Sequence, residues 1–322
     1  MHSKIFRWVG FILLVLNLLI FINRKKGFNY QPVATLEDLY PTISSKSPQT
    51  PVRGTTVYYS AKELKAARQL LLDSTDFIRC TSDIERLLCI NHYLYRAVCQ
   101  NHSVGKLIRY YETPLQLFNA LRTNKQESFQ CGPAAYLHGF FLSAAGFTVR
   151  RIQNLQRPHS PKEPDSHVFN EVWIQELNKW VISDLFQNRH LLVKENTPIT
   201  GADLYQDQAM EKSSPLTIFY SNNDSLSQKV EKVADPFFSK HYYLIYYRET
   251  DPSIVYSWKK KIQHYILSYS HFQLYDPMEH RSNARYHLKQ FVFFAGLGWL
   301  IIFVVGSIRH FFDRSKKHTE IL

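Results

Sequence analysis

The sequence lacks the short motifs that mark the common metal and redox centres. It has only four cysteines, Cys80, Cys89, Cys99 and Cys131, and no two of them are spaced CxxC. A zinc ribbon and a thioredoxin-type redox site are therefore excluded. The HExxH pattern and any internal repeat are also missing. The remaining composition, 322 residues of which 45% are hydrophobic, suits a folded chain with one sizeable core or two small ones.

Acidic residues are scarce relative to basic ones, with 27 Asp+Glu against 39 Lys+Arg. An excess of positive charge can indicate nucleic-acid binding. Here, however, many of the cations lie at the chain ends, in residues 4–7, 24–26 and 309–317, where they flank apolar stretches. Cations in such places are typical of membrane anchors. We therefore expect a membrane partner and no nucleic acid.

Each end of the chain carries one long apolar run. Residues 8–22 read WVGFILLVLNLLIFI, and no small residues follow to form a cleavage site. This pattern favours an uncleaved signal anchor over a cleaved signal peptide, although a cleaved or buried segment remains open. Residues 291–308 contain no charge, which is typical of a membrane span. Two spans place both basic tails on one side of the membrane. Basic tails prefer the cytoplasm, so we expect an extracytoplasmic central region, although the cations on the inner flanks of the two spans nearly balance those of the tails.

The first half of the central region is predicted to be helical. Ser60 and Glu63 form a capping box, a second helix opens at Ser82–Glu85, and Thr113 precedes a proline that suits the first helical turn. A further helix is expected to begin at residue 131 and to stop at residue 146, a glycine.

The pattern then changes to strands. Residues 147–152, 167–174 and 180–185 read as three strands, with a turn over 176–179 between the last two. Helices followed by strands predict an α+β fold. Beyond them we expect a loop-rich stretch with short helices over 196–232. A strand is expected over 241–248, and an amphipathic helix over 255–270.

Three residues in this order could form a nucleophilic site. Cys131 lies at a helix start, whose partial positive charge stabilises a thiolate. His167 begins a strand and could serve as a base, and Asp184 ends the next strand and could orient the imidazole. A turn centred near Leu177 would place residue 170 opposite residue 184, with His167 close by. Each residue alone also has a plain structural interpretation: a buried thiol, a strand histidine and a turn aspartate.

Three segments, QCGPAAYLHGFFLSAAGFTVRRIQ, HVFNEVWI and KWVISDLF, follow one another along the chain. Together they resemble the transglutaminase-like family, a group related to papain, over about residues 60–190. The resemblance implies helices packed on an antiparallel sheet. It also implies Cys131 as nucleophile, His167 as base and Asp184 as the residue that orients the base. The family includes cross-linking enzymes, peptide hydrolases, glycan amidases and inactive scaffolds. Calcium, which eukaryotic cross-linkers use, is not implied because no matching acidic cluster is present, and we expect no cofactor or metal.

The segment KQESFQCGPAA also resembles the peptidase domains of bacteriocin exporters. Those domains, like papain, place an oxyanion glutamine six residues before the cysteine. In this chain Lys125 holds that position, and Gln126 comes one residue late. Gln126 and Gln130 are therefore candidate oxyanion residues, beside the backbone N–H of Cys131.

We expect a membrane-anchored cysteine enzyme that acts on amide bonds of a peptide or protein through an acyl-enzyme, by hydrolysis or acyl transfer. The alternative is a non-catalytic binding or assembly module at the membrane with the same fold. Nothing in the sequence indicates the oligomeric state. The expected divisions are a signal anchor (1–26), a linker (27–56), a transglutaminase-like catalytic domain (57–195), an extension of extra strands and helices (196–288), a transmembrane helix (289–310) and a basic tail (311–322).

Overall fold

The computed structural model describes residues 2–22, 39–40, 54–57, 59–100, 113–124, 130–157, 166–210, 214–233, 235–247, 249–250, 272–276 and 284–319. The chain forms two compact units. One contains the terminal helices α1 (His2–Ile22) and α10 (Ala284–Thr319). The other covers Ala34–Pro252 and His271–His280. It combines helices with mostly antiparallel sheets, which confirms the predicted α+β class.

The helices of the second unit begin where the sequence predicts. Ser60, Ser82 and Thr113 are their N-cap residues, and each side-chain oxygen accepts the backbone N–H three residues later, at 3.2, 3.1 and 3.3 Å. Such caps satisfy backbone donors that the helix itself leaves unpaired. The helices are α3 (Ala61–Ser74), α4 (Asp83–Leu94) and α5 (Pro114–Thr123), with short helical segments η2 (Phe77–Arg79) and η3 (Tyr95–Cys99).

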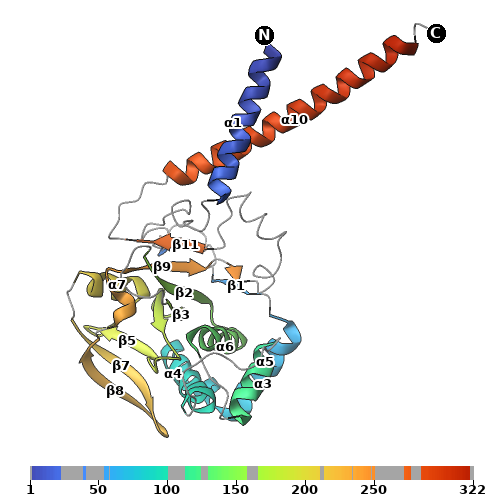
Figure 1. Cartoon of the computed structure of the whole chain (residues 1–322). Coiled ribbons are helices and arrows are strands. Elements are labelled where there is room, and N and C mark those ends of the chain that lie inside the picture. The colour runs from blue at the N-terminus through green and yellow to red at the C-terminus, as the bar shows by residue number, and fades with distance from the viewer. Residues whose placement is uncertain are drawn as a thin grey trace. The chain divides into compact units, whose positions relative to one another are not determined.

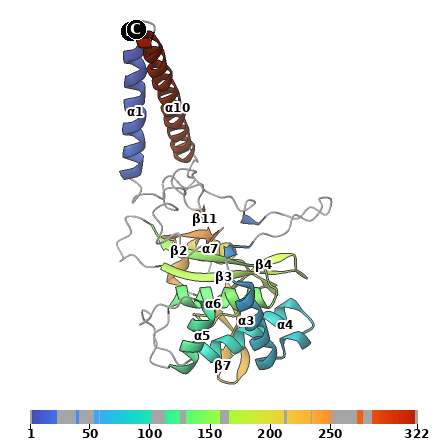
Figure 2. The ribbon, with the colours of Figure 1, turned by 90° about the vertical axis from the view of Figure 1, so that its right-hand side faces the viewer.

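Helix α6 (Cys131–Ala144) is the buried centre of this unit. It lies between a sheet on one side and α3, α4 and α5 on the other (Figures 1 and 2). A helix enclosed in this way is apolar on all faces, and Leu137, Phe140 and Phe141 are fully buried.

The end of α6 confirms the predicted stop at Gly146, which has φ of 96°. The N–H groups of Gly146 and Phe147 donate to the carbonyls of Ser143 and Leu142 at 3.0 and 2.9 Å. This is a Schellman motif, in which glycine adopts the positive φ without strain. The chain therefore leaves α6 in a defined direction and enters the sheet at once.

The larger sheet has the strand order β11-β9-β2-β3-β4, with antiparallel neighbours throughout. The predicted strands are all present, although their ends shift by up to four residues. The strand expected over 241–248 is confirmed as β9. The strands are β2 (Val149–Gln156), β3 (Ser166–Ile174), β4 (Lys179–Ser183), β9 (Tyr242–Tyr247) and β11 (Phe272–Tyr275).

A second sheet corrects the expectation of a loop-rich stretch over 196–232. Its order is β6-β5-β7-β8, and β7 and β8 form a long hairpin that turns at Asn223, where φ is 48°. Most residues of β8 are exposed, so no alternation of apolar residues marked it as a strand. The predicted helix over 255–270 lies outside the described residues. The elements are β5 (Leu191–Lys194), β6 (Thr197–Pro198), α7 (Gly201–Ala209), β7 (Pro215–Asn222) and β8 (Ser225–Lys232).

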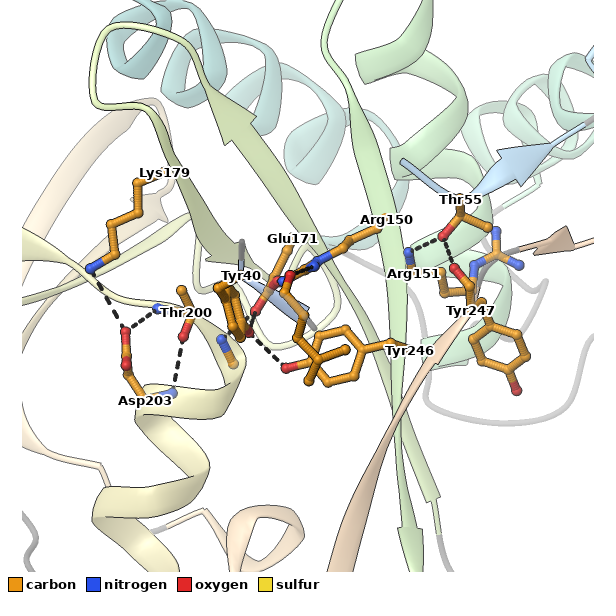
Figure 3. A network of polar contacts seen from close by, with 12 residues as sticks. Tyr40, Thr55, Arg150, Arg151, Glu171, Lys179, Thr200, Asp203, Tyr246 and Tyr247 are labelled. Carbon is orange, nitrogen blue, oxygen red and sulfur yellow. Dashed lines mark hydrogen bonds and ion pairs between the residues drawn. The ribbon is translucent and has the colours of Figure 1, made fainter. Parts of the chain in front are cut away.

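A buried ion pair holds residues from the expected linker against the larger sheet (Figure 3). Arg150 of β2 pairs with Glu171 of β3, with Nη2 2.5 Å from Oε2. Its Nη1 donates to the carbonyl of Leu39 at 2.6 Å, and Tyr40 Oη donates to Glu171 Oε1 at 2.9 Å. The N–H of Gly201, at the start of α7, reaches the same carboxylate oxygen at 2.5 Å. Leu39 and Tyr40 are therefore part of the folded unit.

We expect Arg150→Met to lower the free energy of unfolding by about 3–5 kcal/mol, because Glu171 would remain as a buried charge without its partner. Urea unfolding of the full-length protein measures this change. Exposed Lys229→Met, which removes surface contacts with Glu231 and with the ring of Tyr220, serves as the control and should change stability by less than about 1 kcal/mol. Equal destabilisation by the two variants would contradict the role assigned to Arg150.

The terminal unit contains one helix that is long and apolar enough to cross a membrane, over His287–Ile308 of α10. This finding covers the described residues only. The apolar part of α1, Ile5–Leu19, is shorter than that length. One possible span is therefore established by length and composition, and the predicted second span is not.

Candidate functional site

Cys131 is the first residue of α6, as predicted. Gln130 is its N-cap residue and makes no capping hydrogen bond through its side chain, so that side chain does not occupy the N-terminal N–H groups of α6. Cys131 is half-buried, and its Sγ lies 3.8 Å from the carbonyl oxygen of Ser166, at the start of β3. The thiol therefore stands where the central helix meets the beginning of β3.

His167 and Asp184 are in direct contact. His167 Nε2 lies 2.5 Å from Asp184 Oδ2, and both residues are buried. Because Nε2 contacts the carboxylate, Nδ1 is the ring nitrogen left for Cys131, which lies close enough to the imidazole for each group to shift the pKa of the other. The three predicted residues are thus brought together in one cluster.

The predicted hairpin register is wrong by one residue, and the difference matters. Asn170 pairs with Ser183 rather than with residue 184. Because side chains alternate between the faces of a strand, the observed pairing places Asp184 on the same face as His167 and Phe169. The expected pairing would have placed it on the opposite face. The turn is Gln175–Asn178, and Asn178 has φ of 49°.

Backbone donors fix the carboxylate of Asp184. Its Oδ1 accepts the N–H groups of Phe186 and Gln187 at 3.1 and 3.2 Å. Its own N–H and carbonyl pair with Arg189 at 2.8 and 2.9 Å. One carboxylate oxygen is thus held by the turn, and the other is left for the imidazole.

The electrostatics of the cluster favour a charged thiolate–imidazolium pair. Burial alone would raise the pKa of the Cys131 thiol, but hydrogen bonds from His167 and from the N–H of Val168 lower that pKa below its ordinary value. Burial alone would lower the pKa of His167, but the charge and hydrogen bond of Asp184, assisted by Cys131, raise it to about 10. The same imidazolium lowers the pKa of Asp184 despite burial.

Aromatic rings cover His167. The ring of Phe237 stacks on the imidazole with centroids 5.1 Å apart, and Phe169 and Phe186 lie at 6.0 and 6.2 Å. Phe237 belongs to η4 (Pro236–Phe238), whose carbonyl at Phe237 accepts a hydrogen bond from Asn154 Nδ2 at 2.6 Å. These residues limit the access of water to the ion pair. Sequence reasoning missed them, although Asp-Pro before two phenylalanines is a helix-start signal.

The oxyanion assignments remain predictions. Gln126 lies outside the described residues. Gln130 is exposed at the N-cap of α6, and the backbone N–H of Cys131 is an N-terminal donor of that helix. Among the described residues, no cluster of histidine, cysteine or acidic side chains could hold a metal ion. A hollow of ≈ 290 Å³ is lined by residues of β5, β6 and α7 and by no member of the cluster described above.

Comparisons with known proteins give little beyond this geometry. No protein-family model matches the chain, and no curated protein matches it. A solved structure of a candidate cysteine protease from Cytophaga hutchinsonii is similar to part of it, with 17% identity and a TM-score of 0.29. That match covers 38% of this chain and 38% of the other chain. At this overlap the likeness carries no argument, and the case for a function rests on the site.

Proposed function

We propose that the protein is a cysteine enzyme that acts on amide bonds through an acyl-enzyme. The observation that carries this proposal is the single cluster of Cys131, His167 and Asp184, with the sulfur at a helix N-terminus and the imidazole between sulfur and carboxylate. A thiolate needs a depressed pKa, a base and a group that orients the base. All of these are supplied by residues that come from separate elements of the fold.

The reaction follows from the positions of the protons. Cys131 Sγ, as thiolate, attacks the carbonyl carbon of the amide and forms a C–S bond, and the carbonyl oxygen becomes an oxyanion. The N–H groups at the start of α6 suit this oxyanion. The C–N bond then breaks, and the His167 imidazolium gives its proton to the leaving nitrogen. In the second half His167 takes a proton from water, the resulting hydroxide attacks the thioester, and the C–S bond breaks. An amine in place of water would give acyl transfer.

We further propose that the core is of the transglutaminase-like or papain-related type and that the protein is anchored in a membrane. The order of helix, histidine strand and aspartate strand supports the first part. The apolar helix over His287–Ile308 supports the second. The two-pass topology with an extracytoplasmic central domain rests on the apolar run of α1 and on the basic tails. The substrate class is a peptide or protein amide.

Trapping of the acyl-enzyme tests the proposed reaction. Full-length protein in detergent is incubated with a mixture of peptides, quenched in acid and digested, and the peptide that contains Cys131 is analysed by mass spectrometry. We expect an added acyl mass on Cys131 that hydroxylamine removes. Wild-type protein with no adduct, whose Cys131 thiol also titrates as an ordinary thiol, would instead support a non-catalytic binding or assembly module.

A further inference from the structure

A chain of buried side chains lies beside the site, on the opposite face of β3 from His167. Asn170 faces α6, because it alternates with His167 and Glu171 along the strand. Its Nδ2 donates to the carbonyl of Ala135 at 2.8 Å and lies 3.2 Å from His138 Nδ1. Both partners belong to α6, the helix that begins with Cys131. Asn170 therefore ties the histidine strand to the cysteine helix.

The chain continues from α6 to the aspartate strand. His138 Nε2 lies 2.7 Å from Asn91 Oδ1, and Asn91 Nδ2 donates to Ser183 Oγ at 2.8 Å. Ser183 Oγ donates in turn to the carbonyl of His190 at 2.9 Å. Ser183 immediately precedes Asp184. The same hydrogen-bonded chain thus touches the three elements that carry the cysteine, the histidine and the aspartate.

Donors and acceptors match along this chain only when His138 is neutral. Asn170 Nδ2 donates to Nδ1, so the proton is on Nε2 and points at Asn91 Oδ1. Burial lowers the pKa of His138 to about 4, which keeps the ring neutral at physiological pH. Asn91, His138 and Ser183 are fully buried, so water does not compete for these bonds.

We propose that Asn91, His138, Asn170 and Ser183 are positioning residues that hold Cys131, His167 and Asp184 at their working separations. They do not touch the sulfur or the substrate. They act by fixing α6, β3 and β4 relative to one another at the level of the site. This inference rests on the proposed function, but its readout is the ionisation of Cys131 rather than activity.

The experiment compares His138→Phe, which removes two bonds of the chain, with Arg150→Met, which breaks the buried pair on the other face of the sheet. Iodoacetamide alkylation of Cys131 is followed by mass spectrometry from pH 5 to 10 in the full-length protein. We expect His138→Phe to raise the apparent pKa of Cys131 by at least about one unit. Alkylation at pH 6 should then be about tenfold slower than in the wild-type protein. Arg150→Met should keep the wild-type profile although it is also destabilised.

A conservative variant and a milder one keep the test decisive. His138→Gln retains one acceptor and one donor, so it should recover part of the wild-type profile. If His138→Phe fails to fold, Ser183→Ala takes its place with the same expected direction. An unchanged profile in the folded variant, or an equal shift in Arg150→Met, would overturn the positioning role. Failure of the wild-type protein itself to show a lowered pKa would count against the proposed function instead.

An independent observation concerns the two terminal helices, which lie side by side in Figure 2. Trp299 Nε1 donates to the carbonyl of Phe6 at 2.9 Å, and Asn17 Nδ2 donates to the carbonyl of Val292 at 3.2 Å. Phe6 precedes Asn17 in α1, whereas its partner Trp299 follows Val292 in α10. The two helices are therefore antiparallel. Asn17 Nδ2 also donates to the carbonyl of Leu13 within α1 at 2.9 Å, so the bond that most depends on the pairing of the helices is the one from Trp299.

Glycines allow this close approach. A Cβ at Gly10 would lie 2.0 Å from the ring of Trp299, and one at Gly296 would lie 3.0 Å from Asn17 Nδ2 and 4.0 Å from the Cβ of Leu13. Small residues with an interhelical hydrogen bond are typical of paired membrane helices. We infer that α1 crosses the membrane as the antiparallel partner of α10. The 21 residues of α1 rise about 31 Å, and its apolar part, Ile5–Leu19, rises about 22 Å, so local thinning of the bilayer would accompany this span.

A pair of introduced cysteines tests this arrangement. The separation of 4.0 Å between Leu13 Cβ and a Cβ at position 296 suits a disulfide. Leu13→Cys/Gly296→Cys, oxidised by copper phenanthroline in native membranes, should give the linked peptide in high yield. Leu13→Cys/Gly298→Cys is the control, because a Cβ at Gly298 meets no atom within 4 Å. Equal yields, or rapid labelling of Leu16→Cys by a membrane-impermeant maleimide, would overturn the inference.

Discussion

Cys131→Ala is expected to abolish the acyl-enzyme and to lower the rate of amide cleavage by at least about 10³-fold, since the nucleophile cannot be replaced by the remaining groups. The fold should survive, because Cys131 is half-buried at the helix start and a Cβ is retained. Thermal unfolding of the variant, compared with wild type, checks this point. The measurement is single-turnover acylation followed by mass spectrometry.

The other thiols provide the internal control for this prediction. Burial raises the pKa of Cys89 and of Cys99, and Asp184 adds to the effect at Cys99. These two thiols are therefore expected to stay protonated near neutral pH and to react slowly with electrophiles. Cys99→Ala is the matched variant and should leave acylation of Cys131 intact. Acylation at Cys99 or Cys89 in the Cys131→Ala protein would contradict the assignment of the nucleophile.

Asp184→Asn is expected to remove most of the reactive thiolate at pH 6. Asp184 is the main group that raises the pKa of His167 to about 10, so its loss lets the imidazole lose its proton near neutral pH. Cys131 then loses the positive charge that lowers its own pKa, which should return towards about 8.5. An ordinary thiol is ionised to less than about 10⁻² at pH 6, and alkylation in the variant should fall towards that level.

The alkylation rate of Cys131 in this variant should approach the wild-type rate as the pH rises above about 9, because Cys131 is then ionised in both proteins. This convergence separates an effect on ionisation from a general loss of structure. Asp207→Asn is the control, since Asp207 pairs with Lys194 at 2.6 Å in the second sheet and borders no part of the site. A uniform loss at all pH values, or an equal loss in Asp207→Asn, would count against the role of Asp184.

Local signals in the sequence account for much of the fold around the site. Ser60, Ser82 and Thr113 mark helix starts, and Gly146 marks a helix end, because capping depends on a few adjacent residues. The proximity of Cys131, His167 and Asp184 was predicted by their order on a helix and two strands. The helix ends depend on residues that are close in sequence, and the contact of His167 with Asp184 is fixed by one hairpin.

Other features depend on distant contacts that no local pattern reveals. The strand register depends on where the hairpin turn is centred. The expected pairing centres it on Leu177, whereas the observed pairing of Asn170 with Ser183 centres it half a residue earlier. A shift of one residue in the pairing decides which face of the sheet carries Asp184. Tyr40 lies in a segment of Pro, Ser and Thr that reads as a linker, but Arg150 and Glu171 bind that segment from far along the chain. Strand β8 is mostly polar and lacks the alternation that identifies a strand.

The pH dependence of Cys131 alkylation in the wild-type protein tests the central claim most directly. The account predicts that the rate with iodoacetamide, followed on the Cys131 peptide, is already high at pH 6. It should change little until His167 loses its proton near pH 10. A simple rise with a midpoint near about 8.5, as for a free thiol, would show that no thiolate–imidazolium pair forms and would contradict the account.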